Sequence, residues 1–340
     1  MTIICLVLVF LFDYSHRIWR TEDGLPQNRV QSIAQTPEGY LWVGTSEGLA
    51  RFDGVRFVIF DRSNTAAITD NSIQSLEAAP DGSLWIGTEG GGLLHYARGV
   101  FQAFGEKDGL TNGFIRAIHL DRSGTLWVGT DRGFFRSANR GFVRVDGTTE
   151  IPLASVISIA EDATGKIWVA SGAGLLEFDG ERLKRAPCDP PPGAASLTVS
   201  LVREGLIADG CGVPRITIPD LPISSLHKDA SGNLWIGTVG KGLVSVNLSN
   251  GRSTAYPAPS VIPDNTVLLL FEDRQHDIWV GAQDGLARLS PAVATTLTAA
   301  LSGSEGLLDD NVSTTYEDRE GRALDRHLFG TAIPAQPHHS

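Results

Sequence analysis

Cysteine is scarce in this chain of 340 residues, which holds only Cys5, Cys188 and Cys211. The three show none of the short, regular spacings with which cysteines bind zinc, so they do not indicate a metal site. Cys188 and Cys211 enclose one irregular, proline-rich segment. The sequence leaves open whether these two form a disulfide, as they would in an exported protein, or remain two free thiols.

Positive charge is also in deficit, with 28 lysines and arginines against 39 aspartates and glutamates, a net charge of −11. Nucleic-acid binding depends on basic side chains that neutralise phosphates, so a nucleic-acid partner is not expected. The same excess of negative charge disfavours binding to an anionic membrane surface.

Long hydrophobic runs are missing as well. The apolar stretch Ile3–Phe12 is ten residues long, which is too short to span a bilayer. It matches the core of a secretory signal but lacks a basic flank before it and a small-residue cleavage site after it. We interpret residues 1–15 as a degenerate export signal, with a disordered or buried hydrophobic end as the alternative.

The sequence has no long stretch of helical periodicity, and its 38 glycines and 20% charged residues are typical of a turn-rich all-β protein. It also lacks a nucleophile–base pair, a phosphate-binding loop and a metalloprotease helix. We therefore expect no catalytic residues, no metal and no cofactor, and the chain is not predicted to be an enzyme.

What the sequence does contain is a repeat. The segment Gly39–Arg51 (Gly-Tyr-Leu-Trp-Val-Gly-Thr-Ser-Glu-Gly-Leu-Ala-Arg) returns with small changes along the chain. Its tryptophans recur at intervals of 41 to 44 residues, apart from one interval of 67, at Trp42, Trp85, Trp127, Trp168, Trp235 and Trp279. This period, with one tryptophan in each unit, is typical of a four-stranded blade of a β-propeller.

Each unit divides into four short strands bounded by turn residues. In the first unit we predict strands a to d at Val30–Ala34, Leu41–Thr45, Leu49–Phe52 and Arg56–Phe60. A single sheet of this kind cannot bury both of its faces, whereas sheets stacked around an axis can. The tryptophan of strand b is expected to fill the space between neighbouring blades.

The number of blades is predicted from the first and last copies of the repeat along the chain. Residues 16–20 match a strand d that has no blade of its own, so they are expected to complete the last blade and close the ring. We predict a propeller over residues 16–321 with seven antiparallel blades, the last one incomplete and partly closed by this N-terminal strand. Residues 187–220 would be an insertion, or a decayed blade in an eight-bladed ring. Residues 322–340 form a tail outside the pattern.

The repeat resembles the two-component regulator propeller repeat, through Gly24–Asn28, Gly39–Thr45 and Gly48–Gly54 and their returns over roughly residues 16–320. The resemblance implies the extracytoplasmic, periplasmic sensor region of a bacterial hybrid two-component system, histidine kinase or diguanylate cyclase. It implies a small-molecule ligand, often a saccharide, a homodimer, and a kinase or cyclase output module as partner. The chain would then be a truncated fragment without the transmembrane and output domains.

Candidate ligand-binding residues are charged side chains in the loops that differ between blades, because variable loops on a rigid scaffold commonly carry specificity. These loops join strands b to c and d to a and share one face of the ring. The candidates are Arg29, Glu47, Glu89, Asp131, Arg132, Lys241 and Asp284. The alternative is that they are ordinary solvated loop residues.

Two other sets of polar residues receive structural interpretations. A turn position is occupied repeatedly by aspartate, at Asp121, Asp162, Asp229 and Asp273, and these residues are expected to cap turns. His119 and His227 occupy equivalent positions in blades that are not neighbours, so they are not expected to form a metal pair.

The function predicted from these observations is non-catalytic ligand sensing. A protein-interaction scaffold is one alternative, and it would need an apolar patch on one face. An enzyme similar to streptogramin lyase is another. Such an enzyme would need histidine and acidic residues together at the channel mouth, with a divalent metal.

Overall fold

The structure is a computed structural model that describes residues 14–139, 141–146, 155–186 and 222–291, and the backbone of two further strands. The cysteines Cys5, Cys188 and Cys211, the expected insertion at 187–220 and most of the expected export signal lie outside the described residues. The chain divides into two compact units, Met1–Pro291 and Ala292–Ser340. Within the described residues, no helix is long and apolar enough to cross a membrane.

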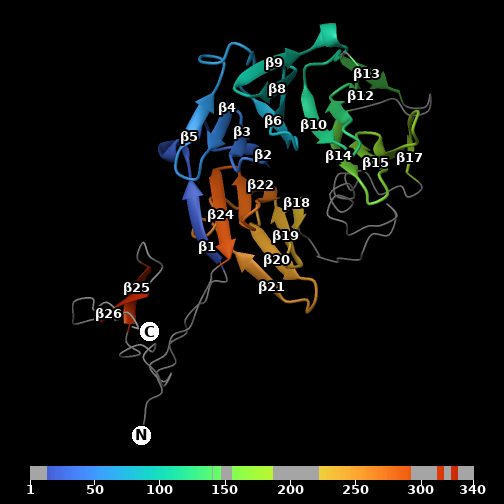
Figure 1. The fold of residues 1–340 in the computed structure, drawn as a ribbon. Helices are drawn as coiled ribbons and strands as arrows, with labels where there is room; N and C mark the ends of the chain where they lie inside the picture. The colour runs from blue at the N-terminus through green and yellow to red at the C-terminus, as the bar shows by residue number, and fades with distance from the viewer. Residues whose placement is uncertain are drawn as a thin grey trace, which may run out of the picture. The chain divides into compact units, whose positions relative to one another are not determined.

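The first unit contains six antiparallel sheets of four strands, which stand around a common axis (Figure 1). The strands of blades one to three are β2 (Val30–Gln35), β3 (Leu41–Thr45), β4 (Gly48–Phe52), β5 (Phe57–Phe60), β6 (Ile73–Ala78), β7 (Leu84–Thr88), β8 (Leu93–Ala97), β9 (Val100–Phe104), β10 (Ile115–Leu120), β11 (Leu126–Thr130), β12 (Gly133–Ala138) and β13 (Gly141–Val145). These bounds confirm the four strands predicted for the first repeat unit to within one residue.

The strands of blades four to six are β14 (Val156–Glu161), β15 (Ile167–Ser171), β16 (Gly174–Phe178), β17 (Leu183–Arg185), β18 (Ile223–Lys228), β19 (Asn233–Thr238), β20 (Leu243–Asn247), β21 (Ser253–Tyr256), β22 (Val267–Glu272), β23 (Ile278–Ala282), β24 (Gly285–Pro291) and β1 (Tyr14–Trp19). Two 3₁₀ turns, η1 (Thr21–Asp23) and η2 (Glu106–Asp108), precede blades one and three.

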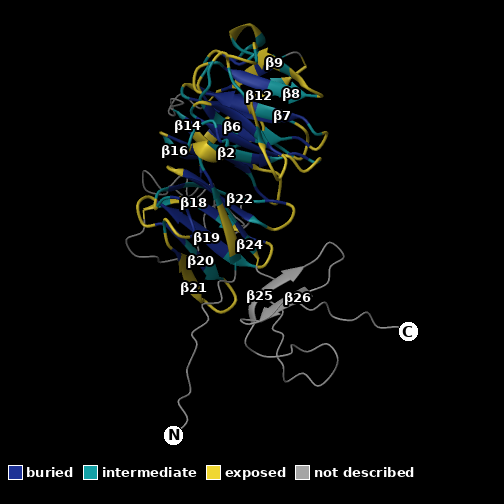
Figure 2. Ribbon diagram, turned by 90° about the vertical axis from the view of Figure 1, so that its left-hand side faces the viewer, coloured by how far each residue is buried: buried dark blue, intermediate teal, exposed yellow. Residues whose placement is uncertain are grey.

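The ring is held by its innermost strands. Strand a of one blade contacts strand a of the next between β2 and β6, β6 and β10, β10 and β14, β18 and β22, and β22 and β2. Blades four and five share a hydrophobic cluster that includes Trp168 and Leu226. The buried residues lie within and between the sheets, and the loops carry most of the exposed ones (Figure 2).

The tryptophan of each strand b packs against the following blade, as predicted. Trp42 packs with Ile73 and Leu84 of blade two, and Trp127 packs with Val156 and Ile159 of blade four. Because a buried aromatic side chain removes ~150–250 Å² from water, these contacts supply much of the energy that joins one blade to the next.

The predicted blade number is wrong, because the described residues form a ring of six blades and not seven. Residues 14–19 do pair as an outermost strand, but their partner is β24, with Trp19 opposite Leu286. That pairing completes the blade of Trp279, which already contacts blade one through β22 and β2. The ring is therefore closed without the segment that was expected to begin a seventh blade.

The second unit contains that segment. Its described part is a two-stranded antiparallel hairpin of β25 (Val312–Glu317) and β26 (Ala323–His327). The hairpin has the register shift near its start that is found between strands a and b of the blades, here between Val312 and Thr314. This local likeness explains why the sequence suggested another blade.

Close contact between blades depends on the glycine that follows the tryptophan motif. A Cβ atom on Gly87 would lie 2.6 Å from Ile115 of blade three, and one on Gly129 would lie 2.3 Å from Val156 of blade four. The equivalent position in blade four is Ala170, which is fully buried. The junction between blades four and five therefore accommodates a methyl group that these two junctions exclude.

Candidate functional site

The face formed by the b–c and d–a loops brings two of the predicted residues, Glu89 and Asp131, into one polar cluster around Arg116. Strand a of each blade begins near this face with a β-bulge, for example between Ile115 and Ala117 in blade three. The bulge adds one residue to the strand and changes the direction in which the side chain of that residue points. Gln74 and Arg116 occupy this extra position in blades two and three.

Arg116 is the centre of a polar cluster. Its guanidinium group donates through Nε to Asp131 Oδ1, and Asp131 also accepts a 3.1 Å hydrogen bond from Ser155 Oγ. The hydrogen bond from Arg116 holds the pKa of Asp131 below its usual value, although burial opposes this shift. The carboxylate of Glu89 adds to the effect of Asp131 in raising the pKa of Arg116. The cluster thus joins charges from blades two and three to a hydroxyl from blade four.

Glu89 is anchored within its own blade. Its Oε2 atom accepts hydrogen bonds of 2.7 Å from Ser72 Oγ and 3.1 Å from Gln74 Nε2. The side chain of Arg116 is 44% exposed and that of Asp131 is 28% exposed, so a ligand from solvent can reach the pair. We call Glu89, Arg116 and Asp131, with Gln74 and Ser155, the Arg116 cluster.

Asp284 belongs to a separate arrangement at the closure of the ring. Its Oδ1 atom accepts a 2.9 Å hydrogen bond from Asn28 Nδ2, and its Oδ2 atom lies 3.4 Å from Arg20 Nε. Arg20 Nε also donates to the backbone oxygen of Asp284 at 3.1 Å. These contacts join the loop after β1 to blade six. Asp284 therefore has a structural role, in which it stabilises the closure of the ring.

The other predicted residues lie in the same loops, and the positive charge of Arg132 also lowers the pKa of Asp131. The backbone N–H groups of Glu47, Arg132 and Lys241 donate to the threonine that ends strand b, at 3.1 to 3.2 Å. The backbone N–H of Arg29 donates to Gln27 Oε1. For Arg29, Glu47 and Arg132, no side-chain hydrogen bond is found among the described residues.

Sequence reasoning missed Gln74, Arg116 and Ser155. The candidates were sought among charged loop residues, whereas Arg116 and Gln74 lie inside strand a and Ser155 is an uncharged residue that precedes β14. For Gln74 and Arg116 the available signal was their place just after the first buried residue of strand a, where the extra residue of the bulge occurs. The bulge itself follows from pairing and not from the residue types.

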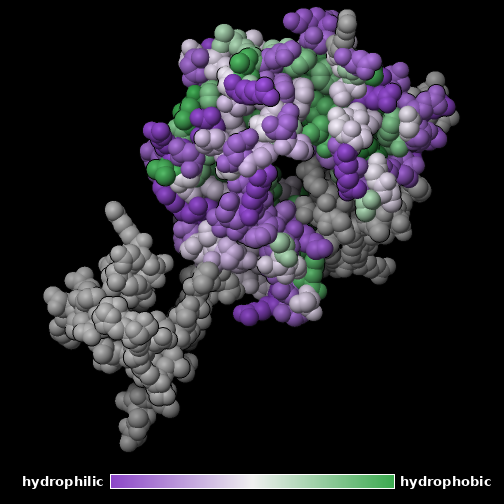
Figure 3. Space-filling view, in the orientation of Figure 1, coloured by the Kyte–Doolittle hydropathy of each residue, from purple (hydrophilic) through white to green (hydrophobic). Residues whose placement is uncertain are grey.

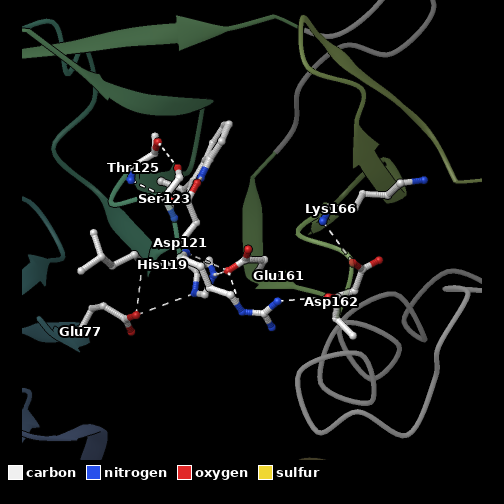
Figure 4. A network of polar contacts seen from close by, with 12 residues as sticks. Glu77, His119, Asp121, Ser123, Thr125, Glu161, Asp162 and Lys166 are labelled. Carbon is white, nitrogen blue, oxygen red and sulfur yellow. Dashed lines mark hydrogen bonds and ion pairs between the residues drawn. The ribbon is translucent and has the colours of Figure 1, made fainter. Parts of the chain in front are cut away.

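The opposite face carries the recurring aspartates, and they cap turns as predicted (Figure 4). Asp121 Oδ1 accepts from the backbone N–H of Thr125 at 2.8 Å, and its Oδ2 accepts from Trp127 Nε1 at 2.7 Å. Asp162, Asp229 and Asp273 likewise accept from the tryptophan Nε1 atoms of their own blades at 2.7 to 2.8 Å. Burial opposes ionisation of Asp121, but its hydrogen bonds outweigh burial and lower its pKa.

Histidines also lie on this face, beside carboxylates of neighbouring blades. His119 lies between Glu77, with Nδ1 at 3.8 Å from Oε1, and Glu161, with Nε2 at 3.9 Å from Oε2 (Figure 4). Glu272 lies 3.1 Å from His227 Nε2 and 2.7 Å from His276 Nδ1. The described ranges contain no group of three or more such side chains arranged to hold a metal ion.

One face of the surface is predominantly hydrophilic, with hydrophobic residues scattered among charged and polar ones (Figure 3). Single exposed apolar side chains are normal on a soluble surface. On this face, the described residues do not gather into the large apolar patch that a protein-interaction scaffold would favour.

Comparison with known proteins shows that four segments of the chain are similar to a known repeat family. A model described as the two-component regulator propeller matches residues 24–47, 67–90, 109–132 and 217–240. No curated protein matches the chain.

Solved structures with this fold include the extracellular domains of BT3049 and BT4673 from B. thetaiotaomicron, both described as hybrid two-component systems. For BT3049 the TM-score is 0.58 at 22% identity, covering 92% of this chain and 46% of that one. For BT4673 the TM-score is 0.61 at 19% identity, covering 92% and 44%. A streptogramin B lyase gives 0.53 at 11%, covering 82% and 98%. At these identities the likeness is one of fold, and the chain spans about half the length of the two extracellular domains.

Proposed function

Because the chain carries two-component regulator propeller repeats, we propose that it is a non-catalytic ligand-sensing propeller from an extracytoplasmic receptor region. The observation that carries the proposal is the Arg116 cluster. It joins side chains of three blades on the face whose loops differ from blade to blade, and it leaves a guanidinium and a carboxylate accessible to solvent. The hydroxyl groups of a small polar ligand, such as a saccharide fragment, would form hydrogen bonds to Arg116 and Asp131 in place of the bond between these two side chains.

The cluster is suited to sensing because its bonds cross between blades. Asp131 of blade three accepts from Ser155 of blade four, and Glu89 of blade two acts on Arg116 of blade three. A ligand that replaces these bonds changes how the blades are joined, and a dimeric receptor would pass this change to a histidine kinase or diguanylate cyclase module. The resemblance of the repeats to sensor domains supports this output.

Thermal-shift measurements against neutral and acidic oligosaccharides test the proposal. A ligand at one hundred times its Kd should stabilise the folded protein by about 2.7 kcal/mol, which is a readily measured increase in Tm. Arg116→Gln should remove most of this increase. The matched control is Arg182→Gln, in an exposed turn on the opposite face, which should preserve it. Failure of every ligand class to raise the Tm would contradict the proposal.

The absence of catalysis needs its own experiment, because streptogramin B lyase shares the fold. Purified protein should contain no stoichiometric divalent metal and should leave cyclic streptogramin B unopened over prolonged incubation. A metal-dependent ring-opening activity that is lost on chelation would assign the chain to the enzyme class instead.

A further inference from the structure

The first blade differs from four of the others at the turn that caps its tryptophan. The Nε1 atoms of Trp127, Trp168, Trp235 and Trp279 each donate to an aspartate six residues earlier. In blade one that position holds Thr36, although the turn keeps the same backbone hydrogen bonds, with Thr36 N donating to Tyr40 O at 3.0 Å. Trp42 is only 1% exposed, and its buried Nε1 atom has no partner among the described residues.

A second group in the same blade lacks the partner that its counterpart has in blade six. Arg51 is paired across the sheet with Trp42, as Arg288 is paired with Trp279 in blade six. Arg288 Nε lies 3.5 Å from Asp277 Oδ2, which stands two residues before its tryptophan. The equivalent residue in blade one is Tyr40, and the Arg51 guanidinium stacks over its ring at 4.6 Å. Within the described residues, no carboxylate forms an ion pair with Arg51.

Trp42 and Arg51 both line one cavity of about 280 Å³ between blades one and two. Its walls include the rings of Tyr40, Trp42 and Tyr96, and Arg51 Nη1 lies 3.5 Å from the Tyr96 hydroxyl. Two carboxylates also line the cavity. Asp81 is committed to its own turn, where it accepts from Ser83 N at 3.0 Å and from Ser83 Oγ at 2.7 Å. Glu38 lies over Gly82 of the same turn, since a Cβ atom there would be 2.2 Å from Glu38 Oε1.

We propose that this cavity binds a small monocarboxylate with a ring-shaped body. The ligand carboxylate would take the place of the two acidic side chains that blade one lacks, accepting from Arg51 and from Trp42 Nε1. A buried donor without a partner costs about 1–3 kcal/mol, so its satisfaction favours binding of an acceptor. The aromatic walls would hold the ring of the ligand. The site lies on the face opposite the Arg116 cluster and does not depend on the sensing role.

Isothermal titration with benzoate tests the proposal, with benzyl alcohol as the neutral ring and acetate as the carboxylate without a ring. Benzoate should bind, and both comparison compounds should bind at least about tenfold more weakly. Thr36→Asp should raise the Kd for benzoate at least about tenfold, because the protein then supplies the carboxylate itself. Tyr40→Asp should do the same by pairing Arg51, as Asp277 pairs Arg288 in blade six.

Arg288→Gln is the matched control, since Arg288 occupies the Arg51 position in blade six and does not line the cavity. It should leave the Kd unchanged, whereas Arg51→Gln should raise it about tenfold. Thermal unfolding of each variant shows that it is folded, and Thr36→Asp should unfold at a higher temperature than the parent. Lack of benzoate binding at millimolar concentration, equal binding of benzyl alcohol, or unchanged binding in both Thr36→Asp and Tyr40→Asp would overturn the proposal.

Discussion

Glu161 of blade four accepts a 3.0 Å hydrogen bond from the backbone N–H of Arg122 in blade three. Equivalent bonds link Glu272 to the N–H of Ala230 at 3.2 Å and Gln35 to the N–H of Arg274 at 2.9 Å. Where the turn residue is Pro37 or Pro80, which have no N–H group, the facing residue is the apolar Ala78 or Leu120. At these five junctions the side chain at the end of strand a therefore matches the donor on the preceding blade, whereas Lys228 of blade five, which faces Ala163 of blade four, is not an acceptor.

We predict that Glu161→Ala lowers the free energy of unfolding by about 1–2 kcal/mol, because it removes an acceptor that joins two blades. Glu161→Gln should cost much less, since glutamine serves this purpose in blade one. Urea unfolding at neutral pH measures both. Equal losses for the two variants would show that charge, and not the hydrogen bond, is what matters.

Close approach of the blades gives a second prediction. Gly87→Ala should destabilise the protein by about 1–3 kcal/mol, because the added methyl group would overlap Ile115 and force the blades apart. Ala170→Gly at the equivalent position of blade four is the control and should change the stability by no more than about 1 kcal/mol. Denaturant unfolding compares the two variants. An unchanged free energy of unfolding in Gly87→Ala would mean that the junction has room for a methyl group.

The hydrogen bond between the tryptophan Nε1 atom and the turn aspartate gives a third prediction. Asp229→Ala should lower the free energy of unfolding by about 1–3 kcal/mol, since Trp235 Nε1 and Asn233 N lose their acceptor inside the protein. Thr36→Ala, at the same position in blade one, should cost less because Thr36 provides no acceptor to Trp42. Thermal denaturation of the two variants should rank them in this order, and the reverse order would contradict the capping account.

Acid sensitivity follows from the same aspartates. Burial opposes ionisation of Asp121 and Asp162, yet hydrogen bonds outweigh it and hold the pKa of both below 3.8 in the folded state. A depressed pKa contributes stability that is present above the unfolded pKa and is lost as the pH falls through the folded one. The unfolding free energy should therefore decline below about pH 4.

Asp162→Asn checks this sign. The variant should be less stable than the parent at neutral pH, and the difference should narrow as the pH is lowered below about 4, because only the parent takes up a proton at this site. Urea unfolding between pH 7 and pH 3 measures the difference. A constant or widening gap would show that Asp162 does not contribute to acid sensitivity.

Ring closure gives a fifth prediction. Trp19→Ala should cost about 3–5 kcal/mol, because this fully buried side chain stacks on Trp279 at 5.3 Å and contacts Phe52 of blade one. His16→Ala, on the exposed part of the same strand, should have little effect. Guanidinium unfolding measures both variants, and similar effects for the two would mean that β1 contributes through its backbone pairing alone.

The sequence by itself determined the strands and turns of the individual blade. The recurring tryptophan, the turn aspartates and the alternation of buried residues are local features, and each strand of the first unit was placed to within one residue. It also indicated that residues 16–20 form an outermost strand. The glycine that follows the tryptophan in five of the six motifs, and the pairing of Glu161 or Gln35 with a turn N–H, are visible in the sequence once the register between blades is known.

Tertiary structure alone decided how many blades there are and which side chains meet on the variable face. The pairing of Tyr14 with Pro291 and of Trp19 with Leu286 joins residues that are far apart in the chain. Hydrogen bonds between strands do not depend on residue type, so a pattern that fits a seventh blade cannot show that the ring has already closed. The Arg116 cluster was likewise set by a bulge in strand a, which arises from pairing and leaves no residue signature of its own.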